Sequence, residues 1–185
     1  METNRIDAFV DQLRNIAEKT TDEREIVSQV RPLVRDVCLN PDWVKDEYLQ
    51  VDRKTGFRVS TLHQEPDHTL AVLAVSWTPG MGVGPHDHGT WAVVGGVQGR
   101  ERNVNWQRTD NGDRDGYADL EKFSEVTAGA GDVMCFRTGD IHSVDNAGDG
   151  VALSLHVYGK HVNHTDRYQY DLATKKMERF IVEEH

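Results

Sequence analysis

Two histidines separated by one residue mark a potential metal site in this sequence of 185 residues. His86 and His88 flank Asp87. On a β-strand, side chains two positions apart point to the same face, so both imidazoles can chelate one ion. A third histidine, His142, ends a second segment that begins at Gly131. Glycines interrupt this segment, as they do between short strands. We therefore expect one metal centre built from two strand segments.

The spacing of these residues resembles the two motifs of the cupins. In the first motif, Gly80 precedes His86 at the expected interval and Gly99 closes the segment. The second motif is matched by Gly131, Gly139, His142 and Asn146, with Arg137 in place of the usual proline. The resemblance implies a mostly β fold, the cupin barrel, which is a double-stranded β-helix of the jelly-roll type.

The ligand set departs from that of many cupins, which carry an acidic ligand a few residues after the second histidine. Ala92 or Val93 takes its place, and no Asp or Glu occurs between Gly89 and Gly99. Three neutral imidazoles leave a divalent ion with its full positive charge and with two or three open positions. An anionic ligand should bind such an ion well, and a thiolate suits a first-row transition metal.

A later strand pattern narrows the resemblance. In the segment from Val151 to Tyr158, the side chains of Ser154, His156 and Tyr158 share one face and apolar side chains share the other. A Ser-x-His-x-Tyr strand follows the third metal ligand in the thiol dioxygenases, the family of cysteine dioxygenase and 3-mercaptopropionate dioxygenase. This sequence resembles that family from about residue 57 to about residue 167. Without the resemblance, the three side chains fit a polar network in a barrel wall equally well.

The resemblance implies an iron(II) enzyme whose partners are a small-molecule thiol and dioxygen. His86, His88 and His142 would hold the iron, and a hydrogen-bonded chain through Ser154 and His156 would put the Tyr158 hydroxyl beside it. The product would be a sulfinate that carries both oxygen atoms of O2. Two other readings stay open: another zinc or iron cupin enzyme, since three histidines and a water also describe a catalytic zinc site, and a non-catalytic cupin that binds a small acid.

Within the family, two positions favour a 3-mercaptopropionate-like substrate over cysteine. Eukaryotic cysteine dioxygenases have a thioether-forming cysteine five residues beyond the second metal histidine, where this chain has Val93. Bacterial 3-mercaptopropionate dioxygenases bind the substrate carboxylate through an arginine shortly after the Ser-x-His-x-Tyr strand, and Arg167 stands at that place. The alternatives are that Arg58, on an early strand, binds the carboxylate, or that Arg167 is a surface residue paired with Asp166 or Asp171.

Composition sets the outer bounds of the interpretation. The chain has 37% hydrophobic residues and a net charge of −10, which fits a single domain over residues 1–185 and argues against nucleic acid and anionic membranes as partners. No apolar run is long enough to span a bilayer, and the first residues lack the apolar region of a secretory signal. We expect a cytoplasmic protein, and the sequence does not indicate its oligomeric state.

Two regimes of residue pattern follow each other along the chain. Residues 1–50 have apolar residues at helical spacing and predict a helical cap, in which Pro32 should kink or divide the second helix. Residues 57–185 predict the barrel and the C-terminal strands. The clearest strand segments are Leu70–Trp77, Trp91–Val97, Arg102–Trp106, Val133–Phe136 and Val151–Tyr158.

The remaining histidines and both cysteines carry no predicted role. Polar surroundings predict that His161, His164 and His185 are exposed to solvent. Two cysteines are too few for a disulfide framework, and Cys135 lies in an apolar run that predicts a small buried side chain.

Overall fold

Two helices and two groups of strands make up the structure, a computed structural model that describes residues 5–52 and 54–181. The helical part consists of α1 (Arg5–Ala17), α2 (Glu23–Leu39) and the 3-10 turns η1 (Pro41–Trp43) and η2 (Asp46–Leu49). The strands are β1 (Phe57–Gln64), β2 (Ala71–Trp77), β3 (Gly82–His86), β4 (Ala92–Gln98), β5 (Glu101–Arg108), β6 (Leu120–Ala128), β7 (Val133–Phe136), β8 (Ile141–Asn146), β9 (Ala152–Tyr158), β10 (Tyr168–Tyr170) and β11 (Met177–Arg179). A further 3-10 turn, η3, spans Val162–His164.

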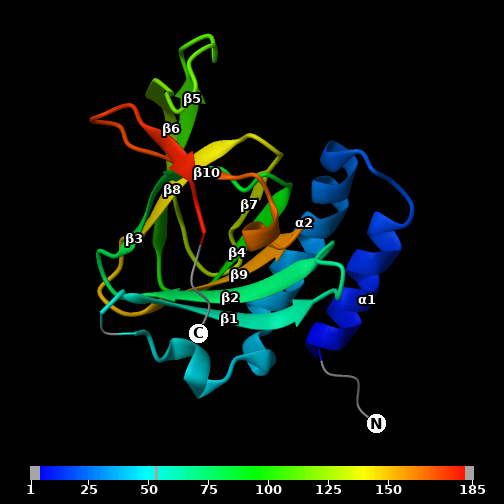
Figure 1. Cartoon of the computed structure of the whole chain (residues 1–185). Helices are drawn as coiled ribbons and strands as arrows, with labels where there is room; N and C mark the ends of the chain where they lie inside the picture. Colours follow the sequence, from blue (N-terminus) through cyan, green and yellow to red (C-terminus); the bar gives the residue numbers. More distant parts are fainter. Residues whose placement is uncertain (1–4, 53, 182–185) are drawn as a thin grey trace.

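The strands form two facing sheets, as the resemblance to the cupins implies (Figure 1). One sheet has the order β1-β2-β9-β4-β7, and the other has the order β11-β10-β3-β8-β5-β6. Neighbouring strands are antiparallel. Many of these neighbours are distant in the chain, such as β2 and β9 in one sheet and β3 and β8 in the other. This arrangement is a double-stranded β-helix with helices at its N-terminal end.

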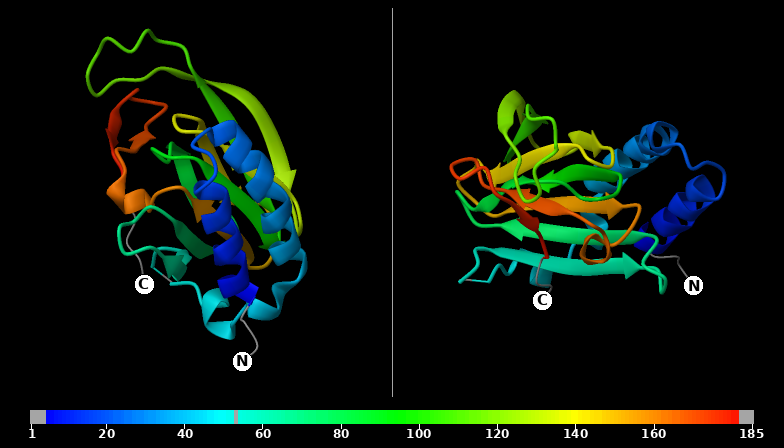
Figure 2. Two further views of the ribbon diagram at one scale, coloured as in Figure 1. Left: turned by 90° about the vertical axis from the view of Figure 1, so that its right-hand side faces the viewer. Right: turned by 45° about the horizontal axis from the view of Figure 1, so that its top comes forward.

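The helices cover the outer face of the first sheet, where Figure 2 shows them lying side by side across the strands. Leu153, Leu155 and Val157 of β9 point outward into an apolar cluster with the buried faces of α1 and α2. The alternate residues of β9 therefore point into the barrel. The predicted helical cap and the predicted two faces of this strand are both confirmed.

Gly95 of β4 allows α2 to approach the sheet closely. A Cβ atom at this position would lie 2.5 Å from Cys38 Sγ and 2.6 Å from Val34 Cγ1. Both atoms belong to the side of α2 that packs on the first sheet. A larger residue at position 95 would push the helix away from the barrel.

Helix α2 differs from the prediction at Pro32. The sequence predicts a kink or a division there, but α2 continues without interruption from Glu23 to Leu39. Pro32 and Ser28 lie on the exposed face of the helix, so water can satisfy the Ser28 carbonyl group that loses its helical donor. Asp22 caps the start of the helix, since its side chain accepts hydrogen bonds from the backbone NH groups of Arg24 and Glu25.

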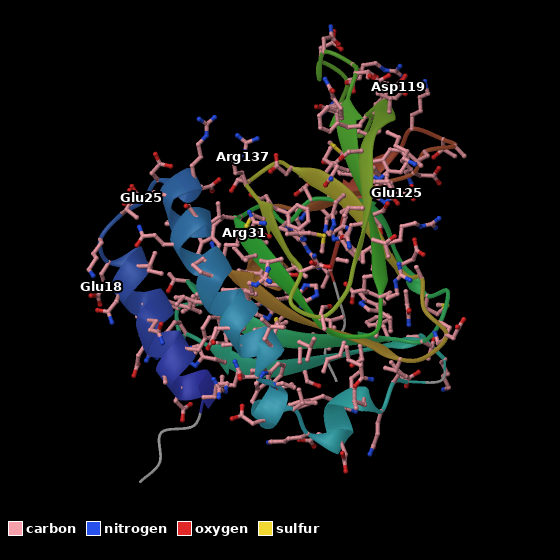
Figure 3. All side chains as sticks on the ribbon, turned by 180° about the vertical axis from the view of Figure 1, so that it is seen from behind. Glu18, Glu25, Arg31, Asp119, Glu125 and Arg137 are labelled. Atoms are coloured by element: carbon pink, nitrogen blue, oxygen red, sulfur yellow. The ribbon has the colours of Figure 1, made fainter. Side chains whose placement is uncertain are left out.

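The pair β5 and β6 extends one edge of the second sheet away from the barrel (Figure 1). The side chains of β6 from residue 121 to residue 127 are exposed, so this strand lacks the alternation that would have marked it in the sequence. Charged side chains such as Asp119 and Glu125 project from this region, as Glu18, Glu25 and Arg31 do from the helical side (Figure 3).

None of the described helices is long and apolar enough to cross a membrane.

Candidate metal centre

A cavity of about 510 Å³ lies between the two sheets. Strands β3 and β8 of the second sheet contribute His86 and His142 to its wall, and β9 of the first sheet contributes His156 and Tyr158. Much of the remaining wall is apolar and includes Phe57, Leu73, Trp77 and Val144. Four of the predicted polar residues therefore line one cavity.

The three predicted metal ligands come together at one side of this cavity. His86 is the last residue of β3 and pairs in register with His142 of β8, while His88 lies two residues further on. One ring nitrogen from each side chain can be chosen so that all three atoms lie within 4.8 Å of one another. All three side chains are buried, so the group can hold a metal ion that is shielded from bulk water.

Hydrogen bonds at the Nδ1 atoms fix the tautomer and the ring orientation of two of the imidazoles. His86 Nδ1 lies 2.9 Å from the Gly84 carbonyl oxygen, and His142 Nδ1 lies 3.1 Å from Asn103 Oδ1. Both oxygens are acceptors, so each Nδ1 must carry the proton and each Nε2 keeps its lone pair. This is the pattern in which an outer partner orients a metal-binding histidine.

The donor set fits a first-row divalent ion. His142 Nε2 and His88 Nε2 are 3.2 Å apart, which is about the separation of two nitrogens that share an ion at roughly 2.1 Å each. Burial lowers the pKa of His86 to about 4 and lowers the pKa values of His88 and His142 well below their ordinary value. The imidazoles are therefore neutral near pH 7 and available as ligands.

Asp87, between the first two ligands, holds their segment against the C-terminal strands. Its carboxylate accepts hydrogen bonds from the Tyr170 hydroxyl at 2.6 Å and from the backbone NH of Gly89 at 3.0 Å. Gly89 has a φ of +62°, and a Cβ there would lie 2.9 Å from Thr165 Cβ. Thr165 in turn donates to the His88 carbonyl oxygen at 2.8 Å. The chain can turn back after His88 because position 89 has no side chain.

The Ser154, His156 and Tyr158 side chains form a continuous hydrogen-bonded chain. Ser154 Oγ lies 2.9 Å from His156 Nε2, and His156 Nδ1 lies 2.8 Å from the Tyr158 hydroxyl. Burial lowers the pKa of His156 to about 3 and raises the pKa of Tyr158 above its ordinary value. Both groups are therefore neutral near pH 7, and Tyr158 can donate a hydrogen bond or accept one.

Arg167 is a buried cation in the wall of the same cavity, with only 3% of its surface exposed. Its Nε donates to the Phe180 carbonyl oxygen at 3.0 Å, and its guanidinium lies 4.3 Å from the centre of the Phe180 ring. Its Nη2 has no hydrogen-bond partner among the described residues. Asp166 pairs with Arg179 instead, and Arg58 bonds Ser60 and does not line the cavity.

The double-stranded β-helix, with two ligands at the end of β3 and the third on the adjacent β8, decides the fold class. The chain has the cupin fold. The structure refines one detail of this cupin: in the register of β4 and β9, Ala92 rather than Val93 stands opposite Tyr158. Val93 faces the helices. Neither residue carries sulfur, and none of the described cysteines lines the cavity.

Solved structures resemble this chain at low sequence identity. An uncharacterised protein with a double-stranded β-helix domain from Klebsiella pneumoniae shares 15% identity, covering 69% of this chain and 91% of that one, with a TM-score of 0.49. A cupin superfamily protein from Desulfitobacterium hafniense shares 16% identity over 62% of this chain and 87% of its own, with a TM-score of 0.44. No protein-family model matches the sequence.

An oxalate oxidase in complex with the substrate analogue glycolate is also similar. It shares 16% identity with a TM-score of 0.46, and the match covers 64% of this chain. The chain spans 59% of the length of that oxidase. Similarity at this level concerns the shape of the barrel and bears on neither substrate nor reaction.

Two buried polar residues of the site were missed in the sequence. Asn103 orients His142, and Glu101 lies two positions earlier on the same strand. Both point inward while Arg102 between them is exposed. The period-two alternation of uncharged or acidic residues with arginines just after Gly99 is the signal that could have marked them.

Two predictions about the remaining residues are wrong. His161 is buried, with 2% of its surface exposed, because it precedes η3 and its ring accepts a hydrogen bond from the Asn163 backbone NH. Cys135 is exposed because it lies on β7, at the edge of the first sheet. His164 is exposed as predicted, and His185 lies outside the described residues.

Proposed function

We propose that this cupin is an iron(II)-dependent thiol dioxygenase that oxidises a small carboxylated thiol with O2 to the sulfinate. One observation carries the proposal: His86 and His142 of the three-histidine group, a buried arginine with an unpaired NH2 group and a Tyr158 hydroxyl at the end of a hydrogen-bonded chain all line the same cavity. The resemblance of the Ser-x-His-x-Tyr strand to that of the thiol dioxygenases supports the same activity.

The reaction balances without a further reductant. A thiol and O2 give a sulfinate and one proton, so sulfur loses four electrons and dioxygen gains four. When bound, iron(II) supplies the redox chemistry, and its uncompensated charge favours the thiolate form of the substrate. The apolar wall around the site keeps bulk water from competing for the reacting groups.

The residues of the chain position the substrate from its two ends. Arg167 binds the carboxylate through the NH groups that have no protein acceptor, as a charge-assisted hydrogen bond. Tyr158 lies on the opposite sheet. Its hydroxyl group hydrogen-bonds the sulfur end of the substrate or an oxygen atom that is transferred to the sulfur. Holding both ends fixes the sulfur at the metal side of the cavity.

The charges of the cavity wall favour 3-mercaptopropionate over cysteine. None of the described residues that line the cavity is Asp or Glu. The ammonium group of cysteine would be desolvated there without an anionic partner and beside the Arg167 cation, which is unfavourable. We therefore propose a substrate with a carboxylate and no amine.

Oxygen uptake with a panel of thiols tests the proposal. The purified protein, loaded anaerobically with iron(II), is given 3-mercaptopropionate, L-cysteine, cysteamine or mercaptosuccinate, and its metal content is measured in parallel. We expect the highest kcat/KM for 3-mercaptopropionate, a lower value for cysteine and the lowest for cysteamine.

Two outcomes would replace the proposal by the alternatives that the sequence leaves open. Stoichiometric zinc after purification, together with no thiol-dependent oxygen uptake after iron loading, would indicate a different metal enzyme. Saturable binding of carboxylates without turnover of any thiol would indicate a cupin that binds small acids.

A further inference from the structure

Glu101 is a buried carboxyl group to which the proposed reaction assigns no task. It is the first residue of β5 and has 5% of its surface exposed. Its Oε1 atom has no hydrogen-bond partner among the described residues, and it is not among the residues that line the cavity. A buried carboxyl without a cationic partner is unfavourable in its charged form, so this position points to a function.

The carboxyl group lies at the inner end of the polar chain on β9. A hydrogen bond with Ser154 favours its charged form, and from Ser154 the chain continues through His156 to the Tyr158 hydroxyl. Tyr158 lines the cavity. Three polar side chains therefore connect the cavity with a carboxyl group buried outside it.

The protonation state of Glu101 sets the direction of every hydrogen bond in this polar chain. An ionised carboxylate only accepts, so Ser154 donates to it and accepts from His156 Nε2–H. His156 Nδ1 is then unprotonated and accepts from Tyr158, whose oxygen faces the cavity as an acceptor. A protonated Glu101 reverses each bond, and the Tyr158 hydroxyl then donates into the cavity.

We propose that Glu101 is the terminal proton acceptor of this chain and takes up the proton that the substrate thiol loses in the cavity, an inference that rests on the proposed function. The S–H bond breaks, its electron pair stays on sulfur, and the proton binds Tyr158 Oη. The Tyr158 proton moves to His156 Nδ1, the His156 Nε2 proton moves to Ser154 Oγ, and the Ser154 proton moves to the carboxylate. One S–H bond is lost and one O–H bond is formed.

The surroundings of Glu101 suit a group that exchanges protons near neutral pH. Burial raises the pKa of Glu101 to about 7, against the opposing effect of the Ser154 hydrogen bond. The titratable groups that interact with it are Cys38 of α2 and Tyr158 of β9, and burial raises the pKa of both, so they are neutral in this range. Its strand neighbours, Ala128 and Asn146, carry no charge.

Infrared spectroscopy of the metal-loaded protein tests the titration without any turnover. We expect the carbonyl band of a buried carboxylic acid to disappear as the pH rises through about 7. Glu101→Gln should abolish the band, because the amide keeps the shape and the acceptor oxygen but binds no proton. Ser154→Ala should raise the midpoint, since the lost hydrogen bond favours the charged form. Glu125→Gln, at an exposed carboxylate of β6, is the matched control and should change nothing.

Proton release on thiol binding tests the transfer itself. Anaerobic, iron-loaded protein is mixed rapidly with 3-mercaptopropionate at about pH 8 in weak buffer with an indicator dye, and thiol binding is followed in parallel by tryptophan fluorescence. In the wild type the proton should reach the dye only after the thiol has bound, because Glu101, with a pKa of about 7, takes it up first and then loses it to water at pH 8. In Glu101→Gln and Tyr158→Phe the two signals should coincide, since coordination then releases the thiol proton directly to water.

The outcomes separate the inference from the function on which it rests. The same delay, or the same lack of delay, of proton release in the wild type and Glu101→Gln would overturn the role of Glu101 and leave the thiol dioxygenase proposal intact. A carboxyl band that survives in Glu101→Gln would do the same. Absence of any thiol binding to the iron-loaded wild type would overturn the proposed function and, with it, the proton transfer.

Discussion

At the scale of single residues, the metal centre depends on side chains that do not touch the ion. Asn103 is almost fully buried and holds the Nδ1 proton of His142, so that Nε2 faces the other ligands. Gly84 does the same for His86 through its carbonyl oxygen. Substitution of Gly84 would leave its backbone oxygen in place, whereas substitution of Asn103 removes the amide. Asn103 is therefore the better position at which to test how the metal ligands are oriented.

Asn103→Ala should weaken iron(II) binding by about 10- to 100-fold, because His142 loses the partner that fixes its tautomer and ring orientation. Affinity is measured by competition with a chelator of known strength. Asn105→Ala is the matched control on the same strand, since the Asn105 amide bonds Ser124 Oγ instead of a ligand. Equal losses in the two variants would contradict the orienting role of Asn103.

Arg167→Ala should lower kcat/KM for 3-mercaptopropionate by about 10- to 100-fold, the effect of losing a charge-assisted contact of about 1.5–3 kcal/mol. Iron content should not change, and the rate with cysteamine should not fall, since cysteamine has no carboxylate. Arg58→Ala should have little effect, because Arg58 does not line the cavity. If the two variants behave the other way round, Arg58 is the carboxylate anchor.

The sequence predicts the three ligands and the Ser154 to Tyr158 row because period two on a strand determines which side chains share a face. It does not predict Asn103 or Glu101, since their importance comes from a neighbouring strand and from the facing sheet. Pairing between strands distant in the chain carries no local signal. The same limitation explains why the sequence does not indicate that Ala92, and not Val93, is the register partner of Tyr158.

At the scale of elements, β9 has two tasks that its alternation keeps apart. Its apolar face packs under the helices and its polar face lines the barrel interior. Every residue of the strand is buried. The packing of α2 on the first sheet therefore supports the strand that carries the polar chain, although the helix contributes no side chain to the cavity.

Gly95→Ala should lower the free energy of unfolding by about 1–3 kcal/mol, because the added methyl group overlaps Cys38 and Val34 of α2. Urea unfolding followed by circular dichroism measures the change. Gly150→Ala is the control: position 150 is exposed and a Cβ there meets no atom within 4 Å, so its effect should stay within about 0.5 kcal/mol. A neutral Gly95→Ala would mean that α2 is held less closely than the structure indicates.

At the scale of the whole molecule, the pattern of helical then alternating residues was enough to predict a helical cap on a β barrel. The pairing of strands into two sheets followed from the family resemblance and not from the residue pattern. Strand β6 escaped prediction because its side chains are exposed on both faces. Burial of several uncharged imidazoles between the sheets is a property of the complete fold, and it makes stability depend on pH.

The metal-free protein should lose stability on acidification partly through His156, whose pKa is lowered by burial from 6.5 to about 3. Between these values the unfolded chain binds a proton that the folded chain excludes, so the free energy of unfolding decreases as the pH is lowered, by up to about 1.4 kcal/mol per unit. The contribution is complete above pH 6.5.

Urea unfolding of wild type and His156→Asn, both treated with chelator, isolates this contribution, since the other buried histidines are common to the two proteins. The stability advantage of the wild type should shrink by about 2–3 kcal/mol between pH 7.5 and pH 4.5. An advantage that is the same at both pH values would show that His156 is not buried in its neutral form.

The central claim is that the three-histidine centre adds both atoms of O2 to the sulfur of a carboxylated thiol. Turnover of 3-mercaptopropionate by the iron-loaded protein under ¹⁸O2, with mass analysis of the product, tests it most directly. We predict a sulfinate with two ¹⁸O atoms, one O2 consumed per thiol, and no such product from His86→Ala. Disulfide and hydrogen peroxide as the only products, or a sulfinate whose oxygen comes from water, would contradict the assignment.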